Sequence, residues 1–182
     1  DKITDRMQQL RTVEMRLELK KGINNCSVIN DSYSADINSL SIALDFLSHQ
    51  QQHPNRTLIL SDILQTGKSS EQLYADVAAM LLQKKINRFI GIGAEIAKQQ
   101  HAFAAIQGSQ FFSSVADFKM HFHALHFFNE TILLKGARVF EFEQIGHLLE
   151  DKVHQTVLEI NLSAITHNLK QYHALLNPGV KL

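Results

Sequence analysis

One short polar segment carries the densest group of side chains that could do chemistry. Residues 30–36 read Asn-Asp-Ser-Tyr-Ser-Ala-Asp and begin at the end of a strand-like run, residues 27–31. Aspartates suit ribose hydroxyls or a metal ion, and ligands of α/β proteins gather where strands end. A helix cap would account for Asn38-Ser39, but not for the two aspartates and the tyrosine before it. We therefore treat this segment as a candidate ligand site.

Strand-like and helical patterns alternate along the chain and would position this segment. Strands are expected at residues 15–19, 27–31, 57–61, 88–92, 110–112 and 131–134. Helices are expected at residues 39–49, 71–84, 94–105, 115–127 and 140–149. Strands and helices that alternate in this way predict an α/β fold, a Rossmann-like, mostly parallel sheet flanked by helices. Gly22 and Asn24-Asn25 join the first two strands, which predicts a hairpin at one sheet edge.

The carboxyl ends of the other expected strands also carry polar groups and glycines. These residues are Asp31, Asp62, Gly91, Gly93, Lys135 and Gly136. Glycines let a ligand approach the backbone closely, and a lysine suits a phosphate or a carboxylate. The pattern predicts a polar ligand, with a nucleotide as one candidate, although Lys135 could equally be an ordinary lysine at a strand end.

Two phosphate-binding motifs are present only in part. Residues 66–69 (Thr-Gly-Lys-Ser) resemble the end of a P-loop, but Asp62 stands where its first glycine is required. Residues 91–93 (Gly-Ile-Gly) lack the third glycine of a dinucleotide fingerprint, because that position is Ile96. A helix cap at Ser69 or Ser70 and a tight strand-to-helix turn explain these residues better. If the protein uses ATP, we expect its phosphate cradle outside this chain.

Histidines and the lone cysteine offer little for a metal site. Of His121, His123 and His126, only the last two share a helix face, and no carboxylate or thiol stands at ligand spacing. We therefore expect no metal site. Cys26 is expected to be a small buried residue of a strand.

The composition is that of an ordinary globular domain. The chain has 182 residues, 45% of them hydrophobic and 20% charged, and its formal net charge is zero. A balanced charge gives no electrostatic case for nucleic acid or an anionic membrane surface as a partner. No apolar run reaches the roughly 18 residues that span a bilayer, and a single cysteine fits a reducing cytosol. We expect a cytoplasmic protein.

Four motifs, in order, resemble the C-terminal domain of MurF-type Mur ligases, which add D-alanyl-D-alanine to UDP-N-acetylmuramoyl-tripeptide. Residues 15–18 are similar to an Arg-Leu strand of that family. Residues 30–40 (N-D-S-Y-S-A-D-I-N-S-L) are similar to its D-D-S-Y-N-A-N-P-x-S-M motif. Residues 61–67 (S-D-I-L-Q-T-G) are similar to G-D-M-x-E-L-G, and residues 134–143 to V-K-G-S-R-x-x-x-M-E. Together the motifs cover about residues 10–150.

The resemblance implies a shared ATP site. In this family ATP lies on a central domain and the C-terminal domain closes over it, so ATP and Mg²⁺ would be bound mainly by a domain missing from this chain. ATP phosphorylates the substrate carboxylate, and an amine then attacks the acyl phosphate. By the resemblance, Asp31 would bind the ribose and Arg16 would reach the ribose or the phosphates.

The same resemblance implies roles for five further residues. Tyr33, Ser34 and Asp36 would line the adenine side or the hinge. Lys135 and Arg138 would face the incoming dipeptide or the reacting phosphate, where cationic donors stabilise developing charge.

Several positions depart from the family pattern. The departures are Asn30, Ser34, Asp36, Ile37, Gln65 and Tyr74. They support an alternative, a degenerate ligase domain that acts as a nucleotide-responsive module or as a scaffold.

The end of the chain resembles a second family. Residues 156–169 are similar to the opening of an alanine racemase, E-I-D-L-x-A-L-x-x-N, with Asn161 in place of its aspartate. The resemblance implies a parent protein that joins the ligase to a racemase, whose pyridoxal phosphate lysine would lie beyond Leu182.

We therefore expect three segments. Residues 1–14 would be a linker from the missing central domain, residues 15–150 the ligase C-terminal domain, and residues 151–182 a linker with the first strand and helix of a truncated racemase domain. Such a piece would be inactive alone. An apolar stripe in its tail would be exposed, so residues 155–182 are expected to self-associate or to be disordered. The stripe consists of Leu162, Ile165, Leu169 and Tyr172.

Overall fold

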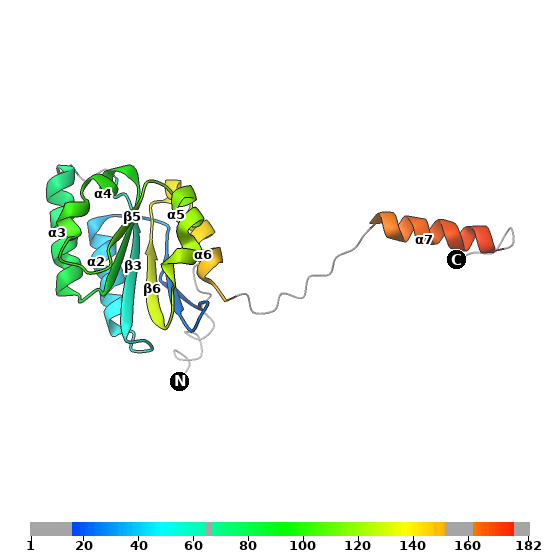
Figure 1. Cartoon of the computed structure of the whole chain (residues 1–182), viewed down its shortest axis with the longest axis horizontal. Coiled ribbons are helices and arrows are strands. Elements are labelled where there is room, and N and C mark those ends of the chain that lie inside the picture. The colour runs from blue at the N-terminus through cyan, green and yellow to red at the C-terminus, as the bar shows by residue number, and fades with distance from the viewer. Residues whose placement is uncertain (1–15, 65–66, 152–161, 177–182) are drawn as a thin grey trace, which may run out of the picture. The chain divides into compact units, whose positions relative to one another are not determined.

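The computed structural model describes residues 16–64, 67–151 and 162–176. The chain divides into two units, residues 1–151 and residues 152–182, and each is described by itself. The first unit is an α/β domain built on one sheet (Figure 1).

Six strands form the sheet of the first unit. They are β1 (Glu18–Lys21), β2 (Ser27–Asp31), β3 (Asn55–Ser61), β4 (Arg88–Ile92), β5 (Gln110–Phe112) and β6 (Glu130–Lys135). Across the sheet their order is β1-β2-β6-β3-β4-β5. Only the β1–β2 pair is antiparallel, so the predicted edge hairpin and the mostly parallel sheet are confirmed. The order places β6, the last of these six strands in the sequence, between β2 and β3.

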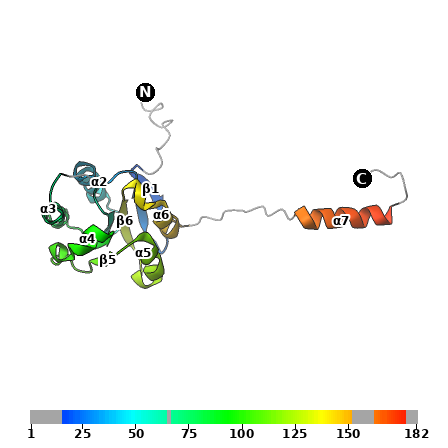
Figure 2. The ribbon, with the colours of Figure 1, turned by 90° about the horizontal axis from the view of Figure 1, so that it is seen from above.

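Helices cover both faces of the sheet. They are α2 (Ile37–His49), α3 (Ser70–Gln83), α4 (Ala94–Lys98), η1 (Gln100–Phe103), α5 (Val115–His121), η2 (Phe122–Leu125), η3 (Arg138–Phe140) and α6 (Glu143–Leu149). Helices α2 and α3 pack on one face, and α5 and α6 pack on the other (Figure 2). Strand β3 serves both faces. Its Leu58 and Leu60 join the core under α2 and α3, while Ile59 joins the core under α5 and α6, as the two-residue period of a strand requires.

Left-handed backbone conformations set several element boundaries. Leu17 has φ 50°, and β1 begins directly after it, at Glu18. The strand was predicted to begin at residue 15, and Met15 lies outside the described residues. His126 (φ 47°) ends η2, which follows α5 where a single helix was predicted. Glu141 (φ 49°) separates η3 from α6, so the last helix of the unit begins later than predicted. The predicted helix 94–105 also divides, into α4 and η1, and Phe103 of η1 stacks on Phe89 at 4.3 Å.

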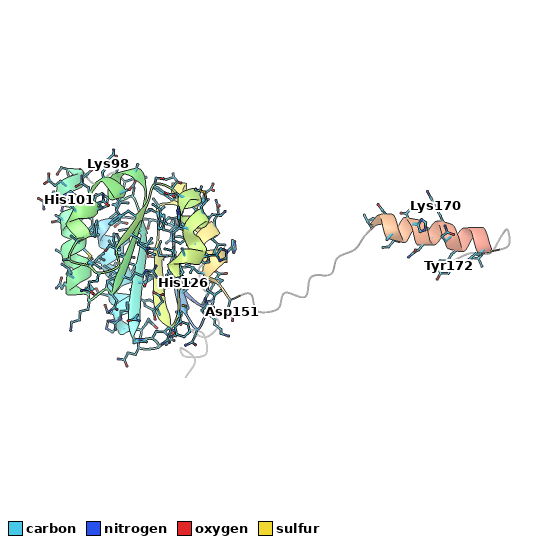
Figure 3. All side chains as sticks on the ribbon, viewed as in Figure 1. Lys98, His101, His126, Asp151, Lys170 and Tyr172 are labelled. Atoms are coloured by element: carbon cyan, nitrogen blue, oxygen red, sulfur yellow. The ribbon has the colours of Figure 1, made fainter. Side chains whose placement is uncertain are left out.

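The described part of the second unit is α7 (Leu162–Leu175). The predicted apolar stripe runs along this helix and is exposed: Leu162 is 73% exposed and Tyr172 60%. Lys170 and Tyr172 project from different sides of α7 (Figure 3). Residues 152–161, where the racemase-like strand was expected, lie outside the described residues. Self-association of the tail stays a prediction.

None of the helices within residues 16–64, 67–151 and 162–176 is both long and apolar enough to cross a membrane.

Candidate functional site

Five of the seven predicted site residues surround one cavity of about 330 Å³. They are Arg16, Asp31, Tyr33, Ser34 and Lys135, and Leu17, Ser39 and Ile42 complete the lining. The cavity lies at the carboxyl ends of β2 and β6 and beside the first turn of α2, where the parallel sheet predicts a ligand. The structure therefore brings these five residues around one shared space, and their roles toward a ligand stay a prediction.

A buried ion pair forms the floor of this cavity. Asp31 and Lys135 are register partners on β2 and β6, and the Lys135 Nζ donates to Asp31 Oδ2 at 2.7 Å. The Lys135 side chain is 0% exposed, whereas the Asp31 side chain keeps 12% exposure. Lys135 thus fixes the Asp31 carboxylate and balances its charge. The role of Lys135 toward the dipeptide or the phosphate stays a prediction.

Two arginines lie over the ring of Tyr33, which is at the mouth of the cavity; of the two, Arg16 lines the cavity and Arg138 does not. The guanidinium carbon of Arg16 lies 4.6 Å from the centre of the Tyr33 ring, and that of Arg138 lies 5.7 Å from it. Both distances fall in the range of cation–π attraction. In the described part of the chain neither guanidinium forms an ion pair. The mouth is therefore positive and suits a polyanion such as a nucleotide phosphate.

Asp36 has a local structural role. Its carboxylate accepts from the Ser39 backbone N–H at 2.9 Å, and the Asp36 backbone N–H donates to the Ser39 hydroxyl oxygen, which makes a capping box at the start of α2. The predicted helix entry at Asn38-Ser39 was therefore late by two residues, because Asp36 is the cap. The Ser39 hydroxyl also donates to Asp36 Oδ2 at 2.6 Å. That hydrogen bond and the one from the Ser39 backbone N–H hold the pKa of the Asp36 carboxyl below its usual range. Ser39 lines the cavity, whereas Asp36 does not.

Replacing Asp36 by alanine is expected to lower the free energy of unfolding by about 1 kcal/mol at pH 7. Because the pKa is depressed in the folded state, the carboxylate stabilises the fold above its unfolded pKa, near 4, and that contribution is lost as the pH falls through the folded pKa. Urea titrations at pH 7 and near pH 3 should show the gap between Asp36→Ala and wild type closing. Ser69→Ala removes the cap of α3, and its cost should be the same at both pH values.

Asp62, which the sequence places at the strand ends where a ligand is expected, instead forms hydrogen bonds within the domain. Its carboxylate accepts from the backbone N–H of Ile96 at 2.7 Å and of Glu95 at 3.3 Å, at the start of α4. The hydroxyl of Tyr74 also donates to it at 3.4 Å. Gly93 makes this approach possible, because a Cβ there would meet the Asp62 carboxylate at 2.3 Å. Asp62 therefore anchors α4 to the end of β3.

Metal-ligating groups do not converge anywhere in residues 16–64, 67–151 and 162–176, where no three of His, Cys, Asp and Glu could hold an ion. His126 ends η2 in a left-handed conformation, so it does not continue a helix face with His123. Cys26 is buried just before β2, and burial raises the pKa of its thiol. It behaves as the small buried residue that the sequence predicts.

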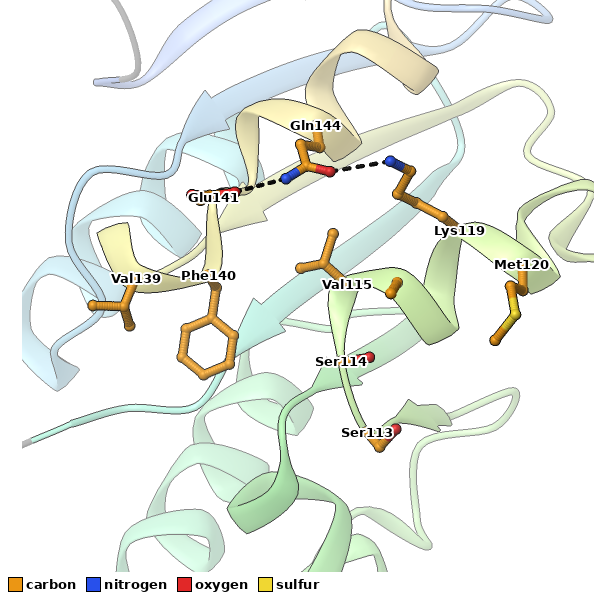
Figure 4. Close-up of a pocket in the computed structure, with 10 residues that line it drawn as sticks. Ser113, Ser114, Val115, Lys119, Met120, Val139, Phe140, Glu141 and Gln144 are labelled. Carbon is orange, nitrogen blue, oxygen red and sulfur yellow. Dashed lines mark hydrogen bonds between the residues drawn. The ribbon is translucent and has the colours of Figure 1, made fainter.

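A second cavity, of about 610 Å³, was not predicted (Figure 4). It lies between the start of α5 and the segment that follows β6. Its lining residues are Ser113, Ser114, Val115, Ala116, Lys119, Met120, Val139, Phe140, Glu141 and Gln144. The lining comes from two separate segments, residues 113–120 and residues 139–144. The motif at residues 134–143 overlaps the second segment but pointed to the nucleotide edge of the sheet and not to this cavity.

Curated relatives that match the chain share one name. The chain is 28% identical over 123 residues to a UDP-N-acetylmuramoyl-tripeptide–D-alanyl-D-alanine ligase of Rickettsia prowazekii, covering 68% of this chain and 27% of that protein. It is 25% identical over 154 residues to the ligase of the same name from Escherichia coli, covering 83% of this chain and 33% of that protein. The chain thus spans a third or less of the length of these relatives.

Solved structures show the same fold. A MurF from Acinetobacter baumannii superposes with a TM-score of 0.66 at 19% identity, over 80% of this chain and 33% of that one. A MurF ligase from Thermotoga maritima, solved with ADP, superposes with a TM-score of 0.55 at 12% identity, over 76% of this chain and 31% of that one. The family model for the Mur ligase, glutamate ligase domain matches residues 15–138, more than half of the chain. With the sheet order and the cavity at the ends of β2 and β6, this match shows that the chain belongs to the Mur ligase, glutamate ligase domain family.

Proposed function

We propose that this chain is the nucleotide-closing domain of an ATP-dependent ligase that adds D-alanyl-D-alanine to UDP-N-acetylmuramoyl-tripeptide. The carrying observation is the cavity at the ends of β2 and β6, which the anchored Asp31 carboxylate lines together with Arg16 and Tyr33, while Arg138 lies over the Tyr33 ring. A carboxylate is a good acceptor for ribose hydroxyls, and two unpaired guanidinium groups suit phosphates. The names of the relatives supply the two substrates.

The proposed reaction has two steps. A carboxylate oxygen of the tripeptide attacks the γ-phosphorus of ATP and ADP leaves, which gives an acyl phosphate. The amine of D-alanyl-D-alanine then attacks the acyl carbon, phosphate leaves and the amine loses a proton to solvent or a nearby base. In this chain, Asp31 binds and orients the nucleotide, and Arg16 and Arg138 offset the negative charge of the phosphates.

Binding of Mg²⁺ and of the ATP phosphates is assigned to a central domain outside this chain. The described residues contain no metal cluster, so we place Mg²⁺ and the phosphate cradle on a central ATP-binding domain outside this chain. The chain alone is then inactive in ligation. The enzyme is placed in the cytoplasm, where ATP is available.

We further propose that the parent protein carries an alanine racemase with pyridoxal phosphate. Its support is the resemblance of residues 156–169, of which the described part forms α7. A racemase would supply D-alanine, the building block of the dipeptide that the ligase consumes. Alanine racemization by the full-length protein, measured after adding pyridoxal phosphate, is the direct test; its absence would limit the assignment to the ligase.

The ligase proposal is tested by phosphate release from ATP, with both substrates present and the full-length protein as enzyme. Asp31→Asn keeps the shape of the side chain but removes its charge, and Arg16→Met removes an exposed guanidinium at little cost to the fold. Each is expected to lower kcat/KM for ATP at least about tenfold, or about 1.4 kcal/mol of transition-state stabilisation.

A matched control is Asp45→Asn, which changes an aspartate on the exposed side of α2 that pairs with Lys84. It should leave kcat/KM for ATP within about twofold of wild type. A wild type that releases no phosphate would instead favour the alternative, a degenerate domain that responds to nucleotide or acts as a scaffold for the racemase.

A further inference from the structure

A buried hydroxyl joins the end of β3 to the segment that follows β6. Ser61 is the last residue of β3 and is fully buried. Its Oγ accepts from the Ala137 backbone N–H at 2.8 Å and donates to the Asp62 carbonyl at 3.0 Å. Strands β3 and β6 are neighbours up to the pair Leu60 and Lys135, so they end side by side. The Ser61 hydroxyl therefore fixes the backbone just after the chain leaves β6.

The segment that Ser61 holds leads directly into the short helix η3. Ala137 immediately precedes this helix, and its carbonyl accepts from the Phe140 N–H at 2.9 Å. On its other side, Gly136 packs so closely on Phe142 that a Cβ there would meet the ring at 2.6 Å. The helix has three residues and no side-chain cap, and so short a helix has little stability of its own. The position of η3 therefore depends on what holds Ala137, to which Ser61 supplies a direct hydrogen bond.

Arg138, the first residue of η3, lies beside the nucleotide cavity. Its guanidinium carbon is 5.7 Å from the centre of the ring of Tyr33, which lines that cavity. The Arg138 side chain is exposed. A long exposed side chain has many rotamers, so the place of its guanidinium is set by its own backbone and by the Tyr33 ring. A shift of η3 would therefore move this positive charge away from the ring.

The residue type at position 61 also departs from the Mur ligase pattern. Residues 61–67 (S-D-I-L-Q-T-G) are similar to G-D-M-x-E-L-G, so Ser61 stands where the pattern has a glycine. A glycine has no side-chain oxygen to offer to the Ala137 N–H. The hydrogen bond from Ala137 to Ser61 is therefore a feature of this chain that the family pattern does not include.

We propose that Ser61 is a positioning residue of the ligation. Through the Ala137 N–H, its hydroxyl sets the start of η3 and so holds Arg138 over Tyr33, beside the nucleotide. Ser61 itself touches neither the nucleotide nor the other substrates. A cation that is already in place needs no rearrangement when charge develops on the phosphates. The proposal rests on the proposed function, in which Arg138 offsets the negative charge of the phosphates.

The first test is the NMR shift of the Arg138 side-chain protons in the 182-residue chain, which requires neither ATP nor ligation. Protons held over the face of an aromatic ring are shifted upfield, and Tyr33→Leu gives the value without the ring. Ser61→Ala is expected to move the Arg138 protons toward that value, because η3 is no longer held. Ser61→Thr keeps the hydroxyl and should leave the Arg138 protons at their wild-type shift.

A matched control removes a different buried hydroxyl from the same strand. Thr57 is fully buried near the opposite end of β3, and its hydroxyl donates to the Glu130 carboxylate. Thr57→Val leaves this buried carboxylate short of a donor, so it should lower the free energy of unfolding. It should nevertheless leave the Arg138 protons at their wild-type shift, because a loss of stability at the far end of β3 does not move η3.

The second test is a double-mutant cycle on phosphate release by the full-length protein, with ATP and both substrates present. Ser61→Ala is expected to lower kcat/KM for ATP about fivefold, and Arg138→Met at least as much. Because Ser61 acts through Arg138, adding Ser61→Ala to Arg138→Met should cost less than about twofold more. Thr57→Val should stay within about twofold of wild type.

Three results would overturn the proposal. They are an Arg138 shift that Ser61→Ala leaves unchanged, the same loss of shift in Thr57→Val, and losses of kcat/KM that multiply in full in the double variant. Failure of the proposed function is seen separately, as a wild-type protein that releases no phosphate. In that case the NMR comparison still supports or overturns the placement of Arg138 by Ser61.

Discussion

Replacing Lys135 by methionine is expected to lower the free energy of unfolding by about 3 kcal/mol. The methionine fills a similar volume, but it leaves the Asp31 carboxylate at the floor of the cavity without its partner at 2.7 Å. Removing one member of a buried ion pair typically costs about 3–5 kcal/mol, because an uncompensated charge remains. The lower end applies here, since Asp31 keeps some contact with solvent. Urea unfolding followed by circular dichroism measures the change.

Two variants separate the ion pair from the loss of a lysine in general. Lys98→Met removes an exposed lysine whose partner, Glu95, is also exposed, and it should change stability little, because exposed pairs contribute little. Asp31→Asn combined with Lys135→Met should cost less than the sum of the single changes, since no charge then stays buried alone. Equal costs for Lys135→Met and Lys98→Met would show that the pair does not anchor Asp31.

The ion pair of Asp31 and Lys135 shows why the strands and helices were predictable from the sequence while this side-chain contact was not. The apolar run of residues 57–60 and the helical period of residues 71–84 are local properties, and the structure places β3 and α3 on these segments. The position of β6 between β2 and β3 is set by a crossover of many residues. Nothing local encodes it, yet it alone makes Lys135 the neighbour of Asp31.

Site residues were predictable where a motif stands at a strand end. Asp31 ends β2 and Tyr33 and Ser34 follow it, and the structure places all three on one cavity. The roles of Asp36 and Asp62 depend on the positions of nearby backbone N–H groups, which the sequence pattern does not specify. Asp36 uses its carboxylate on the N–H of Ser39, and Asp62 uses its carboxylate on α4. An aspartate at a sheet edge can serve either a ligand or a helix terminus, and only the positions of the N–H donors decide between them.

Replacing Asp62 by alanine is accordingly expected to destabilise the domain rather than to weaken nucleotide binding. The change removes the acceptor for the buried N–H of Ile96 and for the N–H of Glu95. It also leaves the buried Tyr74 hydroxyl, whose pKa is raised by burial, without its carboxylate acceptor. An unsatisfied buried donor costs about 1–3 kcal/mol, so we expect a loss of about 3 kcal/mol in the free energy of unfolding. Urea unfolding measures it, and hydrogen exchange at Ile96 should locate the opening at α4.

Asp62→Asn keeps one side-chain oxygen and should recover most of that stability, leaving a loss of about 1 kcal/mol, because a neutral amide accepts more weakly than a carboxylate. In the full-length protein this variant should have a KM for ATP within about twofold of wild type, in contrast to Asp31→Asn. Equal rises in the KM for ATP of the two variants, with stability unchanged, would make Asp62 a ligand contact. That is the role its position at the end of a strand suggested in the sequence. A stability loss without a change in KM assigns Asp62 to the structure of the sheet edge, and leaves Asp31 as the aspartate of the nucleotide cavity.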